Sequence, residues 1–210
     1  MTKTIVVSLA CFCSAWASAA GDAKVPSAVA AQSVKASAEK GDAATQFRYA
    51  QMLRDGRGVA KNVKEAVAWT RKAADSGYAP AQCQMGLFYM NGTGVDLDED
   101  KALEWLKKAA AKDHAQAQYN LGVYYARFSD RKSRSLAMKW LNAAAKQDYA
   151  DAQYNLAQLY LNPHHPASRE QNAGRRAISL LRCAAAQGHA AAKAKLQELG
   201  ITVPPSSSKK

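Results

Sequence analysis

The sequence predicts an all-α protein, an α-solenoid of about four helix-turn-helix repeats of about 36 residues with a C-terminal capping helix. Two patterns that keep the same phase predict it. Trp69, Trp105 and Trp140 are 36 and then 35 residues apart, and an alanine pair follows each four and five residues later. Eight residues after each tryptophan a second pattern begins, "GYAPAQCQMGLFY", "DHAQAQYNLGVYY" or "DYADAQYNLAQLY". Units of this length that bury their apolar faces against one another form a stack.

The two patterns divide residues 41–201 into four full units and a terminal half unit. The full units are 41–76, 77–112, 113–147 and 148–187, and the cap is 188–201. The cap sequence "HAAAKAKLQELG" is more polar than the units, as the exposed end of a stack requires.

Each unit is predicted to contain two helices. In the second unit, small and apolar residues recur at helical spacing in two stretches, Ala81, Met85 and Tyr89, then Ala102, Trp105 and Ala109. The tryptophan column, continued by Leu180, is expected to lie in the core. A second column is expected to allow close helix packing, and it consists of Ala50, Gly86, Gly122 and Ala157.

The stretch "GTGVDLDEDKALEWLKKAA", residues 92–110, places two glycines before a run of acids. A phosphate-binding loop would need Gly-Lys-Ser/Thr after a strand, and the stretch has neither. An EF-hand would need a glycine and a glutamate where this chain has Lys101 and Lys107. We therefore interpret the stretch as a hinge, in which a glycine with positive φ ends one helix and Asp98 or a neighbour caps the next.

Residues 1–20 have the composition of a secretory signal peptide. "MTKTIVVSLACFCSAWASAA" combines an early lysine, an apolar middle and small residues at its end, which predict cleavage after Ala19 or Ala20. A lipoprotein signal ending before Cys11 is an alternative, although it leaves only about seven apolar residues. No later apolar run reaches 18 residues, so no transmembrane segment is expected after signal removal, and the mature protein is expected to be periplasmic or secreted. The tail, residues 202–210, is expected to be disordered.

The composition, 48% hydrophobic and 22% charged, suits one domain with a core, and its net charge of +12 is strongly basic. This charge favours an acidic protein, an anionic lipid or an anionic glycan as partner, while the export signal argues against nucleic acid. Removal of the signal leaves Cys83 and Cys183. The register places them on helices about 20 Å or more apart, beyond the roughly 7 Å that a disulfide can span.

The pattern "A-x-x-Q-x-x-L/M-G-x-x-Y … G-x-G-V … K-A-x-x-W-x-x-K-A-A-x-x-G" closely resembles the Sel-one-like repeat, a relative of the tetratricopeptide repeat. The resemblance covers roughly residues 41–200, but units three and four replace the glycine loop with "ARFSDRKSRS" and "LNPHHPASREQNAGR". Within the N-terminal segment 21–40, residues 28–40 look like a degenerate second helix that caps unit one. The resemblance implies a solenoid whose first helices line the concave side and whose role is to hold other proteins.

Several first-helix positions change from unit to unit while the core columns keep their residue types. On the concave side, their amide, aromatic and aliphatic groups would suit recognition of another chain. A merely solvated face would vary in the same way, so both interpretations stay open. This candidate groove consists of Arg48, Gln51, Gln84, Leu87, Asn120, Val123, Tyr124, Asn155 and Gln158.

Cationic residues concentrate in the atypical loops of units three and four. They would form a basic rim at one end of the solenoid, able to steer an acidic partner, and a purely solubilising surface is the alternative. The basic rim consists of Arg127, Arg131, Lys132, Arg134, Arg169, Arg175 and Arg176.

The sequence indicates no catalytic residues, metal site or cofactor. No serine or cysteine is placed beside an obvious base, and the adjacent His164 and His165 lack further ligands. We expect a non-catalytic module of the bacterial envelope that binds one protein, as an adaptor or as an immunity protein against a type VI lipase-like effector. The alternatives are an envelope or polysaccharide assembly scaffold that binds anionic glycan or lipid, and a cell-wall or β-lactam-active hydrolase. The cysteine pair in each repeat that marks β-lactam-linked relatives is missing here.

Overall fold

The computed structural model describes residues 28–202, and these form ten α-helices and one short 3-10 helix. The helices are α1 (Ala28–Glu39), α2 (Ala43–Asp55), α3 (Val63–Asp75), α4 (Ala79–Asn91), α5 (Glu99–Ala110), α6 (Ala115–Ala126), α7 (Arg131–Lys146), α8 (Ala150–Leu161), η2 (Pro166–Arg169), α9 (Ala173–Ala186) and α10 (Ala190–Glu198). The signal peptide and most of the tail expected from the sequence lie outside the described residues.

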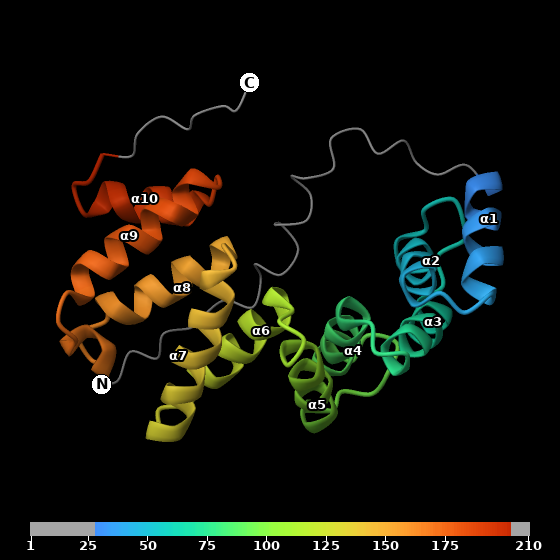
Figure 1. Cartoon of the computed structure of the whole chain (residues 1–210), viewed down its shortest axis with the longest axis horizontal. Coiled ribbons are helices and arrows are strands. Elements are labelled where there is room, and N and C mark those ends of the chain that lie inside the picture. The colour runs from blue at the N-terminus through green and yellow to red at the C-terminus, as the bar shows by residue number, and fades with distance from the viewer. Residues whose placement is uncertain (1–27, 203–210) are drawn as a thin grey trace.

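Each α-helix packs mainly on the α-helices before and after it in the chain, so the fold is a repeat solenoid. Figure 1 shows the pairs arranged in an arc, with α2, α4 and α6 toward its inner side and α3, α5 and α7 toward its outer side. Helix α1 packs on α2 at one end, and α10 packs on α9 at the other. Among residues 28–202, no helix is long and apolar enough to cross a membrane.

The core consists of alanine and leucine columns that repeat from unit to unit. Ala81, Ala117 and Ala152 are completely buried, and Leu106 and Leu141 are at most 1% exposed. Small residues on the first helices allow the second helices to approach closely. A Cβ atom on Gly86 would lie 2.7 Å from Leu106 Cγ, and one on Gly122 would lie 2.7 Å from Leu141 Cγ. The expected close packing at these two glycines is therefore confirmed.

The tryptophan column is only partly buried, whereas the sequence pattern placed it in the core. Lys72 and Lys108 lie over the rings of Trp69 and Trp105, with Nζ 4.2 and 4.4 Å from the ring centroids. The buried column is formed by the following residue, which is Leu106 in unit two. One residue further turns the side chain about 100° around the helix, which separates the core from its rim.

A glutamine on each first helix ties that helix to the one before it. Gln82 Nε2 donates to the carbonyl of Ala74, eight residues earlier, at 3.1 Å. The same bond is made at 3.3 Å by the other three glutamines, namely Gln46 to Ala38, Gln118 to Ala110 and Gln153 to Ala145. Each of these carbonyls also accepts a backbone N–H from the turn that follows its helix, so the glutamine adds a second hydrogen bond at a helix end.

The glycine loops of units one and two are hinges, as the sequence predicted. Gly56 and Gly92 end α2 and α4 with φ of 72° and 64°, a conformation that favours glycine. Asp98 caps α5 by accepting a hydrogen bond from the Lys101 backbone N–H at 2.9 Å. Units three and four differ, because the C-cap of α6 is Arg127 in place of a glycine and the connection after α8 contains η2.

Candidate partner-binding surface

The candidate groove residues lie on α2, α4, α6 and α8, the first helices of the four units. Arg48 is exposed, and most of the others are partly buried. In Figure 1, α2, α4 and α6 face the inner side of the arc. At matching positions the groove therefore changes from Gln51 to Leu87 and Val123 and back to Gln158, which combines polar and apolar side chains on one face.

Hydrogen bonds, two of them between neighbouring units, hold three groove side chains in place. Arg54 Nη1 donates to Gln84 Oε1 at 3.1 Å, and Asn155 Nδ2 donates to the Tyr119 hydroxyl at 3.3 Å. Gln158 Nε2 donates to the hydroxyl of Tyr154 at 3.2 Å. A surface fixed in this way loses less side-chain entropy when a partner binds.

Asn120 is a correction to the candidate groove, because its side chain is buried at 7% exposure. Its Nδ2 lies 3.8 Å from Cys83 Sγ, on the preceding first helix. Asn155, the equivalent residue of unit four, faces the larger Tyr119 and stays partly exposed. The small Cys83 side chain leaves room for the Asn120 amide. Asn120 is therefore buried beneath the groove surface and is not available to a partner.

Cys83 and Cys183 are both free thiols in different environments. Cys83 is buried, whereas Cys183 is exposed on α9. Burial raises the pKa of the Cys83 thiol to about 12, a rise that the amide of Asn120 partly offsets. Cys83 is therefore protonated and unreactive near neutral pH.

Tyr124 stands where the groove meets the α6–α7 loop. Its hydroxyl lies 3.3 Å from Glu99 Oε2, and its ring lies 5.4 Å from the rings of both Tyr125 and Phe128. Partial burial and the negative charge of Glu99 raise the pKa of the Tyr124 hydroxyl. The phenol therefore remains a neutral hydrogen-bond donor at physiological pH.

A second set of aromatic contacts links the first helices, and it was not predicted from the sequence. Each member of one aromatic column contacts a residue at the start of the next first helix, so the contacts cross the boundaries between units. The pairs are Phe47 with Tyr78 at 5.7 Å, Tyr119 with Tyr149 at 5.2 Å and Tyr154 with His189 at 4.8 Å between ring centroids. Both columns can be recognised in the sequence, because their residues recur with the period of the units.

His189 has a structural role at the start of α10. Its Nδ1 accepts the Ala192 backbone N–H at 3.1 Å and so caps α10, while its Nε2 lies 3.1 Å from Asp151 Oδ1. The ring stacks on Tyr154, so every polar atom and one ring face already have a partner. Within residues 28–202, no three His, Cys, Asp or Glu side chains are grouped so that they could hold a metal ion.

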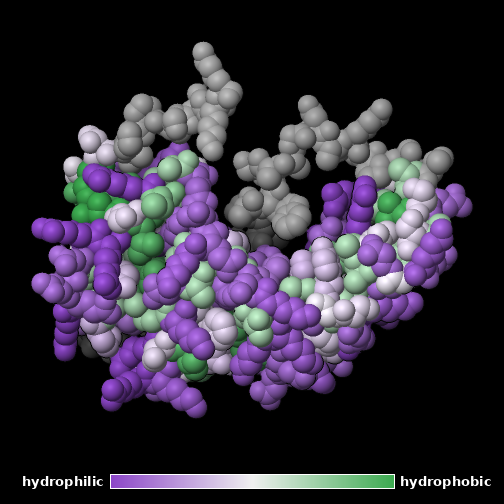
Figure 2. Space-filling model, viewed as in Figure 1, coloured by the Kyte–Doolittle hydropathy of each residue, from purple (hydrophilic) through white to green (hydrophobic). Residues whose placement is uncertain are grey.

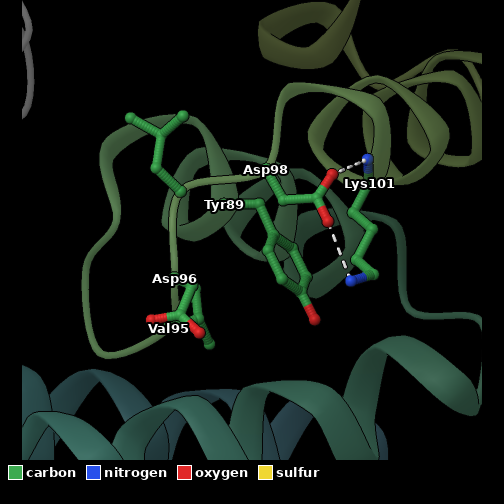
Figure 3. Close-up of a pocket in the computed structure, with 6 residues that line it drawn as sticks. Tyr89, Val95, Asp96, Asp98 and Lys101 are labelled. Atoms are coloured by element: carbon green, nitrogen blue, oxygen red, sulfur yellow. Dashed lines mark hydrogen bonds and ion pairs between the residues drawn. The ribbon is translucent and has the colours of Figure 1, made fainter.

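A shallow cavity of about 440 Å³ lies at the hinge between α4 and α5 (Figure 3). Its lining residues are Tyr89, Val95, Asp96, Leu97, Asp98 and Lys101. Asp98 accepts a hydrogen bond from the Lys101 backbone N–H and pairs with the Lys101 Nζ at 2.8 Å, as the dashed lines of Figure 3 mark. The Tyr89 hydroxyl in turn accepts from Arg71 Nη2 at 2.6 Å. These contacts are those of a helix cap and a loop support.

The basic rim residues fall into two groups. Arg127 lies 3.8 Å from Glu99 and Arg176 lies 2.7 Å from Glu170, so both are paired. The other five belong to α7, η2 and α9, and none forms an ion pair within the described part of the chain. They are Arg131, Lys132, Arg134, Arg169 and Arg175. Figure 2 shows hydrophilic side chains projecting from the end of the molecule that contains α7 and α9.

Solved structures of other proteins are similar to this chain. A crystal structure of a Sel1 repeat protein from Oxalobacter formigenes is 30% identical over 82% of this chain, with a TM-score of 0.70. A protective antigen with the same fold from uropathogenic Escherichia coli is 29% identical over 85%, with a TM-score of 0.73. This chain spans 49% and 39% of those two chains.

An immunity protein from Pseudomonas aeruginosa shares the fold at 24% identity. The match covers 87% of this chain and 67% of that one, with a TM-score of 0.57. A comparison with curated proteins found no match. The Sel1 repeat model matches residues 43–78, 79–114, 115–149 and 150–189, each segment beginning two residues after a unit inferred from the sequence. The chain belongs to the Sel1 repeat family.

Proposed function

We propose that this protein is a non-catalytic binding module of the bacterial envelope that holds one partner protein on the inner face of its solenoid. One observation carries the proposal. Along the first helices the buried columns keep their residue types, while the partly exposed positions between them change from Gln51 to Leu87, Val123 and Gln158. Stability explains the constant columns, and the specific mixture beside them suits the recognition of one surface.

The inner face also has the composition of a protein-binding surface. Aromatic side chains such as Tyr119, Tyr124 and Tyr154 provide large contact areas at low cost in conformational entropy. Amides such as Gln84 and Asn155, held by neighbouring units, provide fixed hydrogen-bonding groups. Rigid aromatic groups beside oriented amides favour a pre-organised site for a folded partner.

The specific form of the proposal is an adaptor or an immunity protein that blocks a secreted effector of the lipase type. The likeness to the P. aeruginosa immunity protein is one of fold, so it makes this role compatible with the architecture and does not assign it. Export to the periplasm is part of the same proposal and rests on the signal-like composition of residues 1–20.

Site-specific photo-crosslinking in the producing cells tests the proposal. A photoreactive phenylalanine analogue at Leu87 or Gln158 on the inner helices is expected to trap one protein, while the same analogue at Lys107 on α5 is not. The trapped protein, once purified, should bind the whole chain one to one, and Leu87→Ala with Tyr124→Ala should weaken binding at least about tenfold, as expected for hot-spot truncation. Equal crosslinking from the inner and outer positions, or unchanged affinity of the double variant, would reject it.

A further inference from the structure

Positive charge is concentrated in the second half of the solenoid. Residues 127–201 contain 12 Lys and Arg but 5 Asp and Glu, a net charge of +7. Residues 28–126 contain 13 and 11, a net charge of +2. The basic character of the described chain therefore belongs to one end of it and is not spread as a solubilising charge would be.

Four of the five unpaired cations of the basic rim sit where helix stability does not favour them, and the fifth, Arg169, lies in the last turn of η2. Arg131, Lys132 and Arg134 lie in the first turn or so of α7, where backbone N–H groups already create positive potential. Arg175 lies in the first turn of α9 in the same way. Cations at these positions oppose the helix dipole, so an anionic partner offers a better explanation of their placement than folding does.

The five unpaired cations of the basic rim belong to one edge of the solenoid. They flank the α6–α7 and α8–α9 connections, which are equivalent loops of adjacent units and so face the same way. Burial chiefly, and the charge of Arg134 on α7 in addition, lower the pKa of His165 in the α8–α9 connection, so Arg134 lies near that connection.

An exposed aromatic side chain accompanies this charge. Phe128 is 43% exposed and precedes the first turn of α7, with its ring 5.4 Å from that of Tyr124. The guanidinium of Arg127 lies 5.8 Å from the centroid of the Tyr124 ring. The edge therefore presents the apolar ring of Phe128, the phenol of Tyr124 and cationic side chains next to one another.

We propose that this edge docks on the surface of an anionic phospholipid bilayer, with Phe128 entering the interface and the unpaired cations contacting the headgroups. Long cationic side chains spread over α7, η2 and α9 match a diffuse sheet of negative charge better than they match a compact acidic site. Stable peripheral binding takes two signals, and charge together with one inserted aromatic provides both. The solenoid would then be held at the membrane with its inner face available to its partner.

Flotation of the whole chain with vesicles tests this inference. The probes are vesicles of phosphatidylglycerol with phosphatidylcholine, and vesicles of phosphatidylcholine alone. The chain should float with the anionic vesicles only, and added salt should release it because exposed charges are screened. Arg131→Gln with Lys132→Gln should lower the partition coefficient on the order of tenfold, given what each cation contributes near an anionic surface.

Two further variants make the result specific. Lys64→Gln with Lys107→Gln removes the same charge from the outer helices α3 and α5 and should change partition no more than about twofold. Phe128→Ser leaves the charge unchanged and should lower partition by about five- to tenfold through lost apolar burial. Thermal melts establish that each variant is folded.

Several outcomes would overturn the inference. They are absence of flotation, equal flotation with both vesicle types, an equal loss for the two double variants, and unchanged partition of Phe128→Ser. Binding of an acidic protein or a soluble anionic glycan at this edge, without flotation, would also overturn it. None of these results bears on crosslinking at Leu87, so the two proposals fail separately.

Discussion

Gln147 Nε2 donates a hydrogen bond to Gln118 Oε1 at 2.8 Å, so the amide oxygen of the buried Gln118 side chain has a partner. Gln118 Nε2 already donates to the carbonyl of Ala110. Unit four repeats the arrangement, with Gln187 Nε2 donating to Gln153 Oε1 at 3.0 Å. In units one and two the equivalent donors are replaced by Ser76 and Lys112, which bond to backbone carbonyls instead.

The replacement leaves two buried acceptors without a partner in the described structure, Gln46 Oε1 and Gln82 Oε1. Lys112→Gln is expected to restore the missing bond to Gln82 and raise the free energy of unfolding by about 1 kcal/mol, and Ser76→Gln should do the same for Gln46. Gln147→Ala should lower it by about 1–2 kcal/mol, because it creates the orphan acceptor that the other variants remove. Urea unfolding measures all three, and a stabilisation by Gln147→Ala would contradict the assignment.

Gly122→Ala is expected to destabilise the protein by about 1–3 kcal/mol, because the new methyl group has no space against Leu141. Gly174→Ala on α9 is the matched control. A Cβ atom there meets nothing within 4 Å, and the change should be neutral or stabilise by up to about 1 kcal/mol. Thermal unfolding of the two variants should therefore differ in sign or clearly in size.

Coupling to Leu141 tests the cause of that loss. Gly122→Ala combined with Leu141→Ala should cost less than the sum of the two single changes, because the smaller residue makes room for the added methyl group. Strict additivity would mean that the glycine is needed for another reason.

The sequence predicted the repeat register, the helix pairs and the glycine hinges because buried columns and turns constrain residue type in every unit. It did not predict how far each large side chain is buried. Trp105 and Leu106 are adjacent in a helical pattern, yet only the geometry of the neighbouring helix decides which one is buried.

Asn120 shows the same limit within the candidate groove. Its column is partly exposed at Gln84 and Asn155, and it is buried in unit three because the neighbouring residue is Cys83 and not an aromatic. The exposure of one residue thus depends on the side chain one unit away. The residue types in one column, taken alone, therefore do not predict the exposure of Asn120.

The two cysteines of the described chain are expected to react very differently with thiol reagents. Cys183 is exposed, while burial raises the pKa of Cys83 to about 12 and excludes the reagent. Iodoacetamide at mildly alkaline pH should modify Cys183 within minutes and leave Cys83 unmodified until the chain is unfolded. Peptide mass spectrometry measures both sites in one sample. Early modification of Cys83 would show that α4 and α6 open readily.

Stability is expected to fall as the pH falls below about 6.5, because histidines cap helices in their neutral form. His114 Nδ1 accepts the Ala117 backbone N–H at 3.3 Å, and burial lowers the pKa of this imidazole below its usual 6.5. The unfolded chain therefore binds the proton first, so the stabilising contribution is complete above about pH 6.5 and is lost as pH falls through the folded pKa. His165, which caps η2 in the same way, contributes with the same sign.

His114→Asn is the variant that isolates this effect. Asparagine can cap α6 without titrating, so the variant should keep most of its stability at pH 7.5 and lose less than the parent on acidification to pH 5.5. The capping carboxylates do not obscure the result, since Asp42, Asp98 and Asp130 have pKa values lowered below 3.8 by bonds to their helix ends. Their contributions are lost only in more acidic solution. Urea unfolding at the two pH values measures the difference, and an unchanged pH dependence in the variant would show that His114 is not the titrating cap.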